Sequence, residues 1–142
     1  MRILPLALLL SLALAMTQGV ALAGDKTKVV YHVDDEDKVS FTLNNIQNHI
    51  DGVGGPENID VVLVANGPAV KQFVDIDAVD RVRNGVAELE KQGVGFEACA
   101  NTLQALGVAP DELLPGFKVA EKGGVTRITE LQQQQGYAYL RP

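Results

Sequence analysis

Hydrophobic residues follow two kinds of pattern along the chain. Residues 29–33 and 59–65 are nearly continuous apolar runs rich in β-branched side chains, which is typical of strands covered on both faces. Between them, four apolar residues at spacings of 4, 3 and 4 define one face of a helix: Val39, Leu43, Ile46 and Ile50. The pattern therefore predicts a strand, a helix and a second strand.

The second strand is followed by a turn at residues 66–68 and by a short helix or turn at residues 69–74. A second long helix is predicted from four apolar residues at spacings of 3, 4 and 3: Val79, Val82, Val86 and Leu89. Gly93 ends this helix, and residues 94–98 form the predicted third strand.

A third helix is predicted directly after that strand. Asn101 and Thr102 are residues that favour a helix N-cap, and Gly107 is suited to the helix end. We expect Leu103 and Leu106 to face inward from this helix.

The end of the chain continues the alternation. Residues 117–120 and 137–140 are predicted strands, and the helix between them carries three apolar residues on its inner face: Val125, Ile128 and Leu131. Strands that alternate with helices in this way predict an α/β fold, with a mainly parallel five-stranded sheet between helices. The four helical patterns exclude a β-sandwich.

Residues 1–23 have the features of a secretory signal peptide, with Arg2, a short apolar run and an Ala-Leu-Ala cleavage site ending at Ala23. Cleavage would leave 119 residues, 24–142, which is the usual size of a single domain. No later run approaches the roughly 18 apolar residues of a membrane-spanning helix. We therefore expect a soluble periplasmic or secreted protein after removal of the signal peptide.

The charge balance excludes two classes of partner. Arg2 is the only charged residue in the first 23, so cleavage changes the formal net charge from −6 to −7. An acidic chain without a basic stripe is not suited to nucleic acid or to an anionic membrane surface. The run 34–37 is acidic, and we interpret it as the N-terminus of a helix rather than as a metal site.

The sequence argues against a zinc site, because it offers one cysteine and two histidines without close ligand spacing. No motif indicates a cofactor: the glycines at residues 52–55 follow a helix, where a dinucleotide fingerprint would follow a strand.

Candidate site residues follow the predicted strands. The carboxyl ends of strands in an open parallel sheet meet at one edge, where ligands usually bind. Five residues there are predicted to form a small pocket for a polar or sulfur-bearing ligand: His32, Asn66, Gly67, Cys99 and Asn101. The sequence leaves open whether this pocket catalyses turnover.

Cys99 is the candidate catalytic residue, and two interpretations of it remain open. A thiol just before a helix N-terminus has its thiolate stabilised, which lowers its pKa and makes it reactive. Alternatively, Cys99 is buried among Ala98, Ala100 and Leu103, and desolvation would then raise its pKa and block reagents. Because the only cysteine has no partner within the chain, an internal disulfide is excluded.

Four segments of the chain together resemble an exported DsrE/DsrF-like protein: residues 29–34 (VVYHVD), 64–68 (VANGP), 98–103 (ACANTL) and 136–142 (GYAYLRP). The resemblance implies a three-layer α/β/α domain with a five-stranded parallel sheet. It also implies assembly as a homo-oligomer, a trimer or a hexamer.

In the sulfur-relay branch of that family, a cysteine after the third strand carries sulfur as a persulfide and passes it to a partner. Cys99 matches that position, and Gly107 ends the following helix as a glycine does there. This chain has Ala105-Leu106 where relay members carry basic residues. The resemblance thus implies that Cys99 handles reduced sulfur with a donor or acceptor protein. The alternative is a non-catalytic oligomeric binding protein in which Cys99 is structural.

Overall fold

The computed structural model describes residues 24–142, which form a five-stranded sheet in which every strand pair is parallel. The strand order across the sheet is β4-β3-β2-β1-β5. The strands are β1 (Thr27–Val33), β2 (Ile59–Ala65), β3 (Gly95–Cys99), β4 (Phe117–Ala120) and β5 (Ala138–Leu140). All five predicted strands are therefore confirmed, with ends that differ by at most two residues.

Helices connect the strands in the predicted alternation. The α-helices are α1 (Val39–Gly52), α2 (Asp80–Lys91), α3 (Ala100–Leu106) and α4 (Gly124–Gln135). Four short 3₁₀ turns join them to the sheet: η1 (Glu36–Lys38), η2 (Pro56–Asn58), η3 (Gly67–Phe73) and η4 (Pro110–Glu112). Asp35 caps η1 by accepting a hydrogen bond from the backbone N–H of Asp37, as expected for the acidic run.

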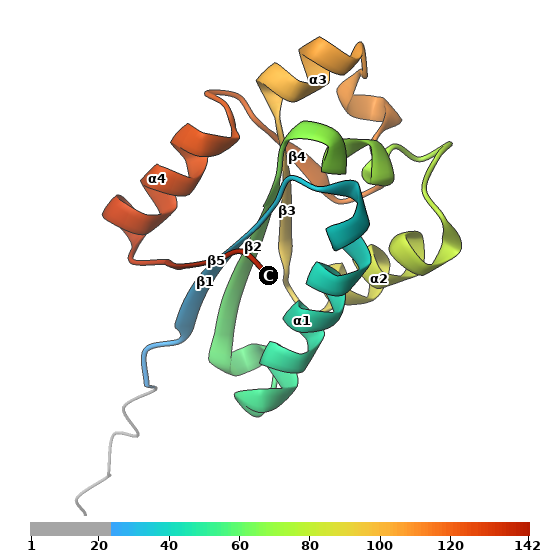
Figure 1. Ribbon diagram of the computed structural model, residues 1–142. Helices are drawn as coiled ribbons and strands as arrows, with labels where there is room; N and C mark the ends of the chain where they lie inside the picture. The colour runs from blue at the N-terminus through green and yellow to red at the C-terminus, as the bar shows by residue number, and fades with distance from the viewer. Residues whose placement is uncertain (1–23) are drawn as a thin grey trace, which may run out of the picture.

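Helices cover both faces of the sheet, with α1 and α2 on one face and α4 on the other (Figure 1). Successive side chains of a strand point to opposite faces, so alternate residues of β1, β2 and β3 enter different cores. The core on the α1 and α2 face is large and includes Leu63, Phe73 and Phe96. The core beneath α4 is small, with four buried residues: Val30, Val64, Ile128 and Leu131. The three-layer α/β/α fold predicted from the sequence is confirmed.

Two predicted inward residues and one predicted cap are wrong. Val125 is 67% exposed, because only Ile128 and Leu131 of α4 reach the small second core. Leu106 is 36% exposed, because α3 lies at the end of the sheet and buries Leu103 alone. The N-cap of α3 is Cys99, two residues before the predicted Asn101, because β3 continues to Cys99 and hands over directly to the helix.

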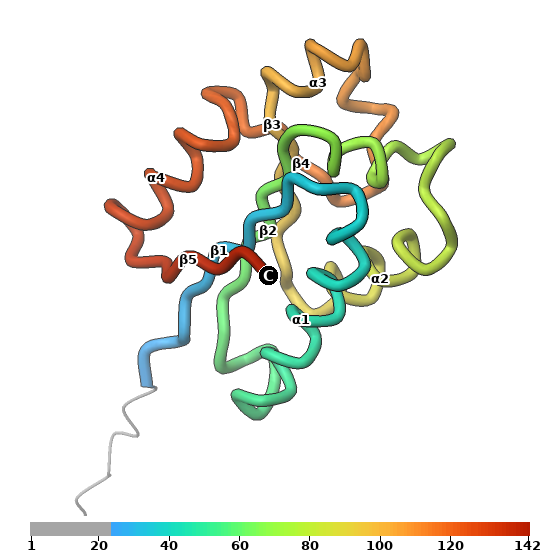
Figure 2. The backbone as a smooth tube through the Cα atoms, in the orientation of Figure 1, coloured from blue at the N-terminus to red at the C-terminus, as the bar shows by residue number. Residues whose placement is uncertain are grey.

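The connections after β3 and β4 leave the sheet on opposite sides. The chain after β3 enters α3, whose Leu103 joins the large core, whereas the chain after β4 enters α4 on the other face. Figure 2 shows the chain passing from β4 over the end of the sheet to α4 and back to β5 beside β1. Divergent connections from neighbouring strands open a crevice at their carboxyl ends, which is where α/β folds bind ligands.

The predicted signal peptide, residues 1–23, lies outside the described residues. Among the helices of residues 24–142, none has the length and apolar character needed to cross a membrane.

Candidate functional site

Cys99 lies at the carboxyl end of β3, beside the end of β4. It is the last residue of β3, it pairs in register with Ala120 at the end of β4, and it is the N-cap of α3. Its side chain points to the α4 face of the sheet, where it meets the first residue of that helix, Gly124. Only 6% of the residue is exposed.

Hydrogen-bond donors surround the Cys99 sulfur. Burial raises the pKa of the thiol, but backbone N–H groups of Gly124, Thr102 and Asn101 and the hydroxyl of Thr102 donate to the sulfur and lower it by more. The net effect is a pKa below the ordinary thiol value. The thiol is therefore buried, as one interpretation required, and acidified, as the other required.

The hydroxyl of Thr102 is held in place by a second hydrogen bond. The backbone N–H of Gly67 donates to Thr102 Oγ1 at 3.0 Å. Because Oγ1 accepts this bond, its own hydrogen is directed elsewhere, and it donates to Cys99. Gly67 thus acts on the thiol through Thr102.

Gly124 allows α4 to approach the thiol closely. A Cβ at this position would lie 3.3 Å from Cys99 Cβ, 3.3 Å from Val64 Cγ1 and 3.5 Å from Asn66 Cβ. The two contacts at 3.3 Å would be tighter than ordinary van der Waals contact, so the missing side chain lets the backbone of α4 pack directly against Cys99 and Asn66. It also lets the Gly124 N–H, at the positive end of the α4 dipole, reach the sulfur.

His32 and Asn66 lie beside Cys99 on the same face of the sheet. His32 Nε2 is 2.9 Å from Asn66 Oδ1, and His32 Nδ1 is 2.7 Å from the hydroxyl of Tyr139. These three residues come from β1, the end of β2 and β5, which are neighbours in the sheet. Together they form a hydrogen-bonded row that leads from the edge strand toward Cys99.

The predicted residues Gly67 and Asn101 lie apart from this row. They line an apolar groove of about 320 Å³ between η3 and α3, together with Pro68, Lys71 and other residues. The side-chain nitrogen of Asn101 also approaches Gly123, directly before α4. The five predicted site residues thus divide into three that face α4 and two that line the groove.

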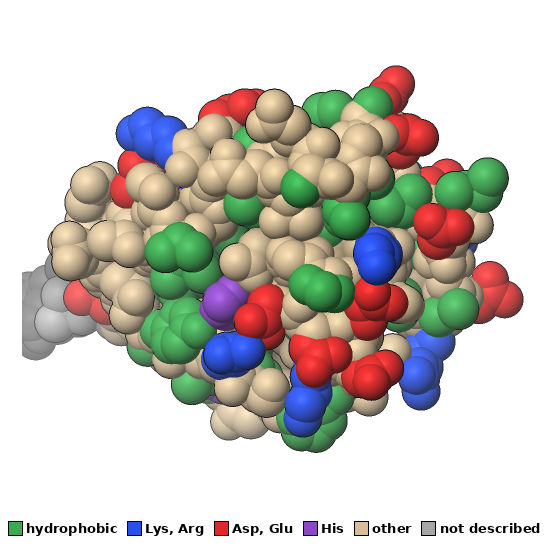
Figure 3. Space-filling view, turned by 45° about the horizontal axis from the view of Figure 1, so that its top comes forward, with side chains coloured by type: hydrophobic (Ala, Val, Ile, Leu, Met, Phe, Trp, Pro, Cys, Tyr) green, Lys and Arg blue, Asp and Glu red, His purple; other side chains and the backbone are tan. Residues whose placement is uncertain are grey.

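Charged residues surround the end of β1. Arg141 Nη2 donates to both carboxylate oxygens of Asp34, at 2.8 and 2.7 Å, and ties the C-terminal segment to β1. An open cavity of about 550 Å³ lies over this pair and the neighbouring acidic run. Figure 3 shows this end of the molecule, with acidic side chains gathered and basic ones between them.

Residues 24–142 contain no cluster of three or more histidine, cysteine or acidic side chains arranged to hold a metal ion.

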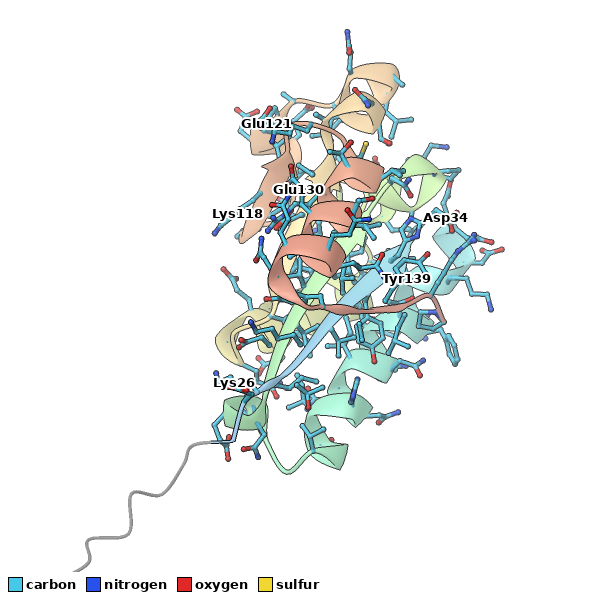
Figure 4. The ribbon with its side chains drawn as sticks, turned by 90° about the vertical axis from the view of Figure 1, so that its left-hand side faces the viewer. Lys26, Asp34, Lys118, Glu121, Glu130 and Tyr139 are labelled. Carbon is cyan, nitrogen blue, oxygen red and sulfur yellow. The ribbon has the colours of Figure 1, made fainter. Side chains whose placement is uncertain are left out.

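An ion pair holds α4 against β3. Arg127 Nε lies 2.8 Å from Glu97 Oε2, and Arg127 Nη2 lies 3.0 Å from Glu97 Oε1. The hydrogen bonds that Arg127 donates to Glu97, only partly offset by burial, raise the pKa of Arg127, which stays charged. The side chains are 28% and 12% exposed, so this pair is mostly shielded from water. In Figure 4, Lys118, Glu121 and Glu130 lie on one side of α4, and Tyr139 and Asp34 lie beyond the other.

Three residues of the site were not predicted from the sequence: Thr102, Gly124 and Tyr139. The sequence predicts Thr102 as part of a helix cap, although a threonine hydroxyl can also donate a hydrogen bond to a nearby side chain. Gly124 follows Gly123, and paired glycines before a helix indicate close approach. Tyr139 had no local signal, because its contact with His32 spans 107 residues.

The sequence matches the model of one protein family. The sequence model described as DsrE/DsrF-like family matches residues 25–142. The chain is 34% identical to protein MTH1491 of unknown function from Methanobacterium thermoautotrophicum, covering 82% of this chain and 100% of that one with a TM-score of 0.71. No curated protein matches the chain.

Two further solved structures share the fold. The ychN protein from E. coli is 14% identical, with a TM-score of 0.64 over 82% of this chain and 99% of that one. Protein BT1422 of unknown function from Bacteroides thetaiotaomicron is 21% identical, with a TM-score of 0.58 over 84% of this chain and 97% of that one. At these identities the likeness supports the fold alone.

Proposed function

The chain belongs to the DsrE/DsrF-like family, and from this premise we propose that it carries reduced sulfur as a persulfide on Cys99. The observation that carries the proposal is the set of N–H donors around the sulfur, which lowers the pKa of the thiol despite its burial. The thiolate is the nucleophile in sulfur chemistry, so a lowered pKa raises its abundance at neutral pH.

The transfer step needs no oxidant beyond the donor. The Cys99 thiolate attacks the terminal sulfur of a donor persulfide, and an S–S bond forms between Cys99 and that sulfur. The S–S bond of the donor breaks, and its electron pair leaves on the donor thiolate. The transferred sulfur keeps its proton or loses it to water, and the same step in reverse order passes the sulfur to an acceptor.

The backbone of Gly124 packs directly against Cys99 and Asn66, so the closed site is tight around the thiol. An added sulfur atom would therefore lie under the first turn of α4 once that turn has shifted outward, where it is shielded from water. Shielding matters because exposed persulfides react with other thiols.

Burial of Cys99 requires that the site opens for transfer. The thiol lies under the first turn of α4, and that helix contributes only Ile128 and Leu131 to its small core. A segment with few buried apolar contacts opens at a lower free energy than the whole domain. We therefore assign transfer to a form in which α4 has moved away from β3.

Labelling with iodoacetamide at a series of pH values tests the acidified thiol. The rate in folded protein should reach half of its maximum below about pH 8.5, the value of an ordinary thiol, and the denatured protein should titrate near that value. Mass spectrometry of protein isolated from its own cell should show Cys99 with one added sulfur atom. A folded midpoint at or above the denatured one, with no added sulfur, would contradict the proposal.

The burial itself favours a second candidate function, a non-catalytic oligomeric binding protein with an inert Cys99. In that case Cys99→Ser should lower the free energy of unfolding and change no sulfur-transfer activity. The two functions differ in whether inorganic polysulfide adds sulfur to the folded wild-type protein.

A further inference from the structure

The hydrogen-bonded row of Tyr139, His32 and Asn66 has a defined direction. Asn66 Oδ1 only accepts hydrogen bonds, so the hydrogen between it and His32 belongs to Nε2 of the imidazole. In the neutral ring, Nδ1 then carries no hydrogen and accepts from the hydroxyl of Tyr139 at 2.7 Å. Tyr139 therefore selects the imidazole tautomer that donates to Asn66.

The row fixes the orientation of the Asn66 amide. Its oxygen points to β1, where His32 lies, so the NH₂ group of the planar amide points to the opposite side. That side is β3: Ala65 and Ala98 are register partners, so Asn66 and Cys99 are the next neighbours. Within residues 24–142, Asn66 Nδ2 makes no hydrogen bond and is not one of the donors to the Cys99 sulfur.

The two sulfur atoms of a Cys99 persulfide would need separate donors. The inner sulfur already accepts hydrogen bonds from Gly124, Asn101 and Thr102. The outer sulfur would extend from Cys99 along the α4 face of the sheet toward Asn66, because the side chains of Cys99 and Asn66 both lie against Gly124. An amide with an unused N–H group at that place is suited to bind a sulfur that carries negative charge.

We propose that Tyr139 is a positioning residue that acts through His32 to hold the Asn66 amide with its NH₂ group on the outer sulfur of the Cys99 persulfide. This inference rests on the proposed function and adds to it the group that retains the carried sulfur. Tyr139 touches neither sulfur atom. Its effect therefore depends entirely on Asn66, which makes the arrangement testable.

The first test measures retention of the carried sulfur. The purified protein is loaded with inorganic polysulfide, and the release of sulfur to cyanide is followed as thiocyanate. Tyr139→Phe removes one hydroxyl and should speed release about three- to tenfold, the effect of one neutral hydrogen bond. Asn66→Ala should speed release at least as much, and adding Tyr139→Phe to Asn66→Ala should change nothing further.

The chain offers a matched control for Tyr139→Phe. Tyr31 also makes a hydrogen bond to a histidine, with 3.0 Å between its hydroxyl and His49 Nδ1, but on the other face of the sheet. Tyr31→Phe should lower stability without changing the rate of sulfur release. Iodoacetamide labelling of unloaded Tyr139→Phe should match wild type, which separates retention of sulfur from opening of α4.

A spectroscopic readout separates positioning from a structural role. In ¹⁵N-labelled protein, loading should shift the side-chain NH₂ signals of Asn66, and Tyr139→Phe should reduce that shift. The proposal is overturned if the Asn66 signals do not move on loading, if Tyr139→Phe releases sulfur like Tyr31→Phe, or if its effect persists in Asn66→Ala. If wild-type protein takes up no sulfur from polysulfide, the proposed function fails and this inference falls with it. If the wild-type protein loads sulfur normally but Tyr139→Phe releases it at the wild-type rate, only this inference is refuted and the proposed function stands.

Discussion

Removal of the Arg127 side chain should make Cys99 react faster by loosening α4. Arg127 bonds both carboxylate oxygens of Glu97, and the pair is largely shielded from water. A hydrogen bond to a charged group contributes about 1.5–3 kcal/mol. In Arg127→Met, the Glu97 carboxylate is shielded from water and has no partner until α4 opens. The free energy of the lost hydrogen bond therefore shifts the equilibrium in full toward the open form. At 1.4 kcal/mol per factor of ten, labelling should be about 10- to 100-fold faster.

The assay is iodoacetamide labelling of Cys99 in native protein at increasing urea, compared with global unfolding by circular dichroism. α4 contains 12 of the 119 residues in the domain. A domain of this size has a urea slope of about 1–3 kcal/mol/M, so opening of α4 alone should show a slope of about a tenth of that. Lys91→Met is the matched control, because its ion pair with Glu88 on α2 is 70% and 66% exposed and contributes little.

Two results would refute this reasoning. A wild-type labelling slope equal to the global slope would mean that Cys99 reacts only in the unfolded protein. A labelling rate in Arg127→Met within about twofold of Lys91→Met would mean that α4 does not control access to the thiol.

Three further predictions concern the same molecule. Gly124→Ala should reduce sulfur loading because its methyl group would crowd Cys99 and Asn66, whereas Gly85→Ala, with a similar 3.3 Å contact to Leu43 in the other core, should load normally. Equal loading in both variants would argue against a loading site beside Gly124. Because the pKa of Cys99 is lowered in the folded state, its thiolate stabilises the fold at high pH. The difference in unfolding free energy between wild type and Cys99→Ser should therefore be largest above about pH 8.5 and shrink as pH falls through the folded pKa, and a difference independent of pH would refute it. N-terminal sequencing of native protein should begin at residue 24, and an intact Met1 would refute cleavage of the signal peptide. Light scattering should show a trimer or hexamer, and a monomer would refute the expected assembly.

The sequence predicted the strands, the helices and the edge of the sheet that carries the site, because these depend on local spacing. Continuous apolar runs and one-sided helices are sufficient to place His32, Asn66 and Cys99 at strand ends. The sequence could not predict the order of the strands across the sheet. Pairing of β5 with β1 brings Tyr139 to His32, and nothing local to either residue encodes that contact.

The sequence also could not predict how much of each helix surface contacts the core. Val125 has the same helical spacing as Ile128, yet it is 67% exposed because α4 covers only part of its sheet face. The state of Cys99 was missed for a different reason. Burial was expected to raise the thiol pKa, which holds for a thiol surrounded by methyl groups. Here N–H groups help to bury the sulfur, so shielding from water and stabilisation of the thiolate occur together.

Because the thiol is both buried and acidified, one curve of labelling rate against pH can measure two properties separately: the pKa of Cys99 and its access to the reagent. In most molecules α4 is packed against β3. The amount of Cys99 thiolate in molecules with α4 open therefore rises with pH in proportion to the amount of thiolate in molecules with α4 closed. The midpoint of the curve therefore reports the pKa of the closed form, which Gly124, Thr102 and Asn101 determine, although the reaction takes place after opening. The maximal rate reports the opening equilibrium, which the pair of Arg127 and Glu97 limits. Arg127→Met should accordingly raise the maximal rate and leave the midpoint unchanged. A midpoint that moved with the rate would mean that the ion pair, rather than the N–H donors, acidifies Cys99.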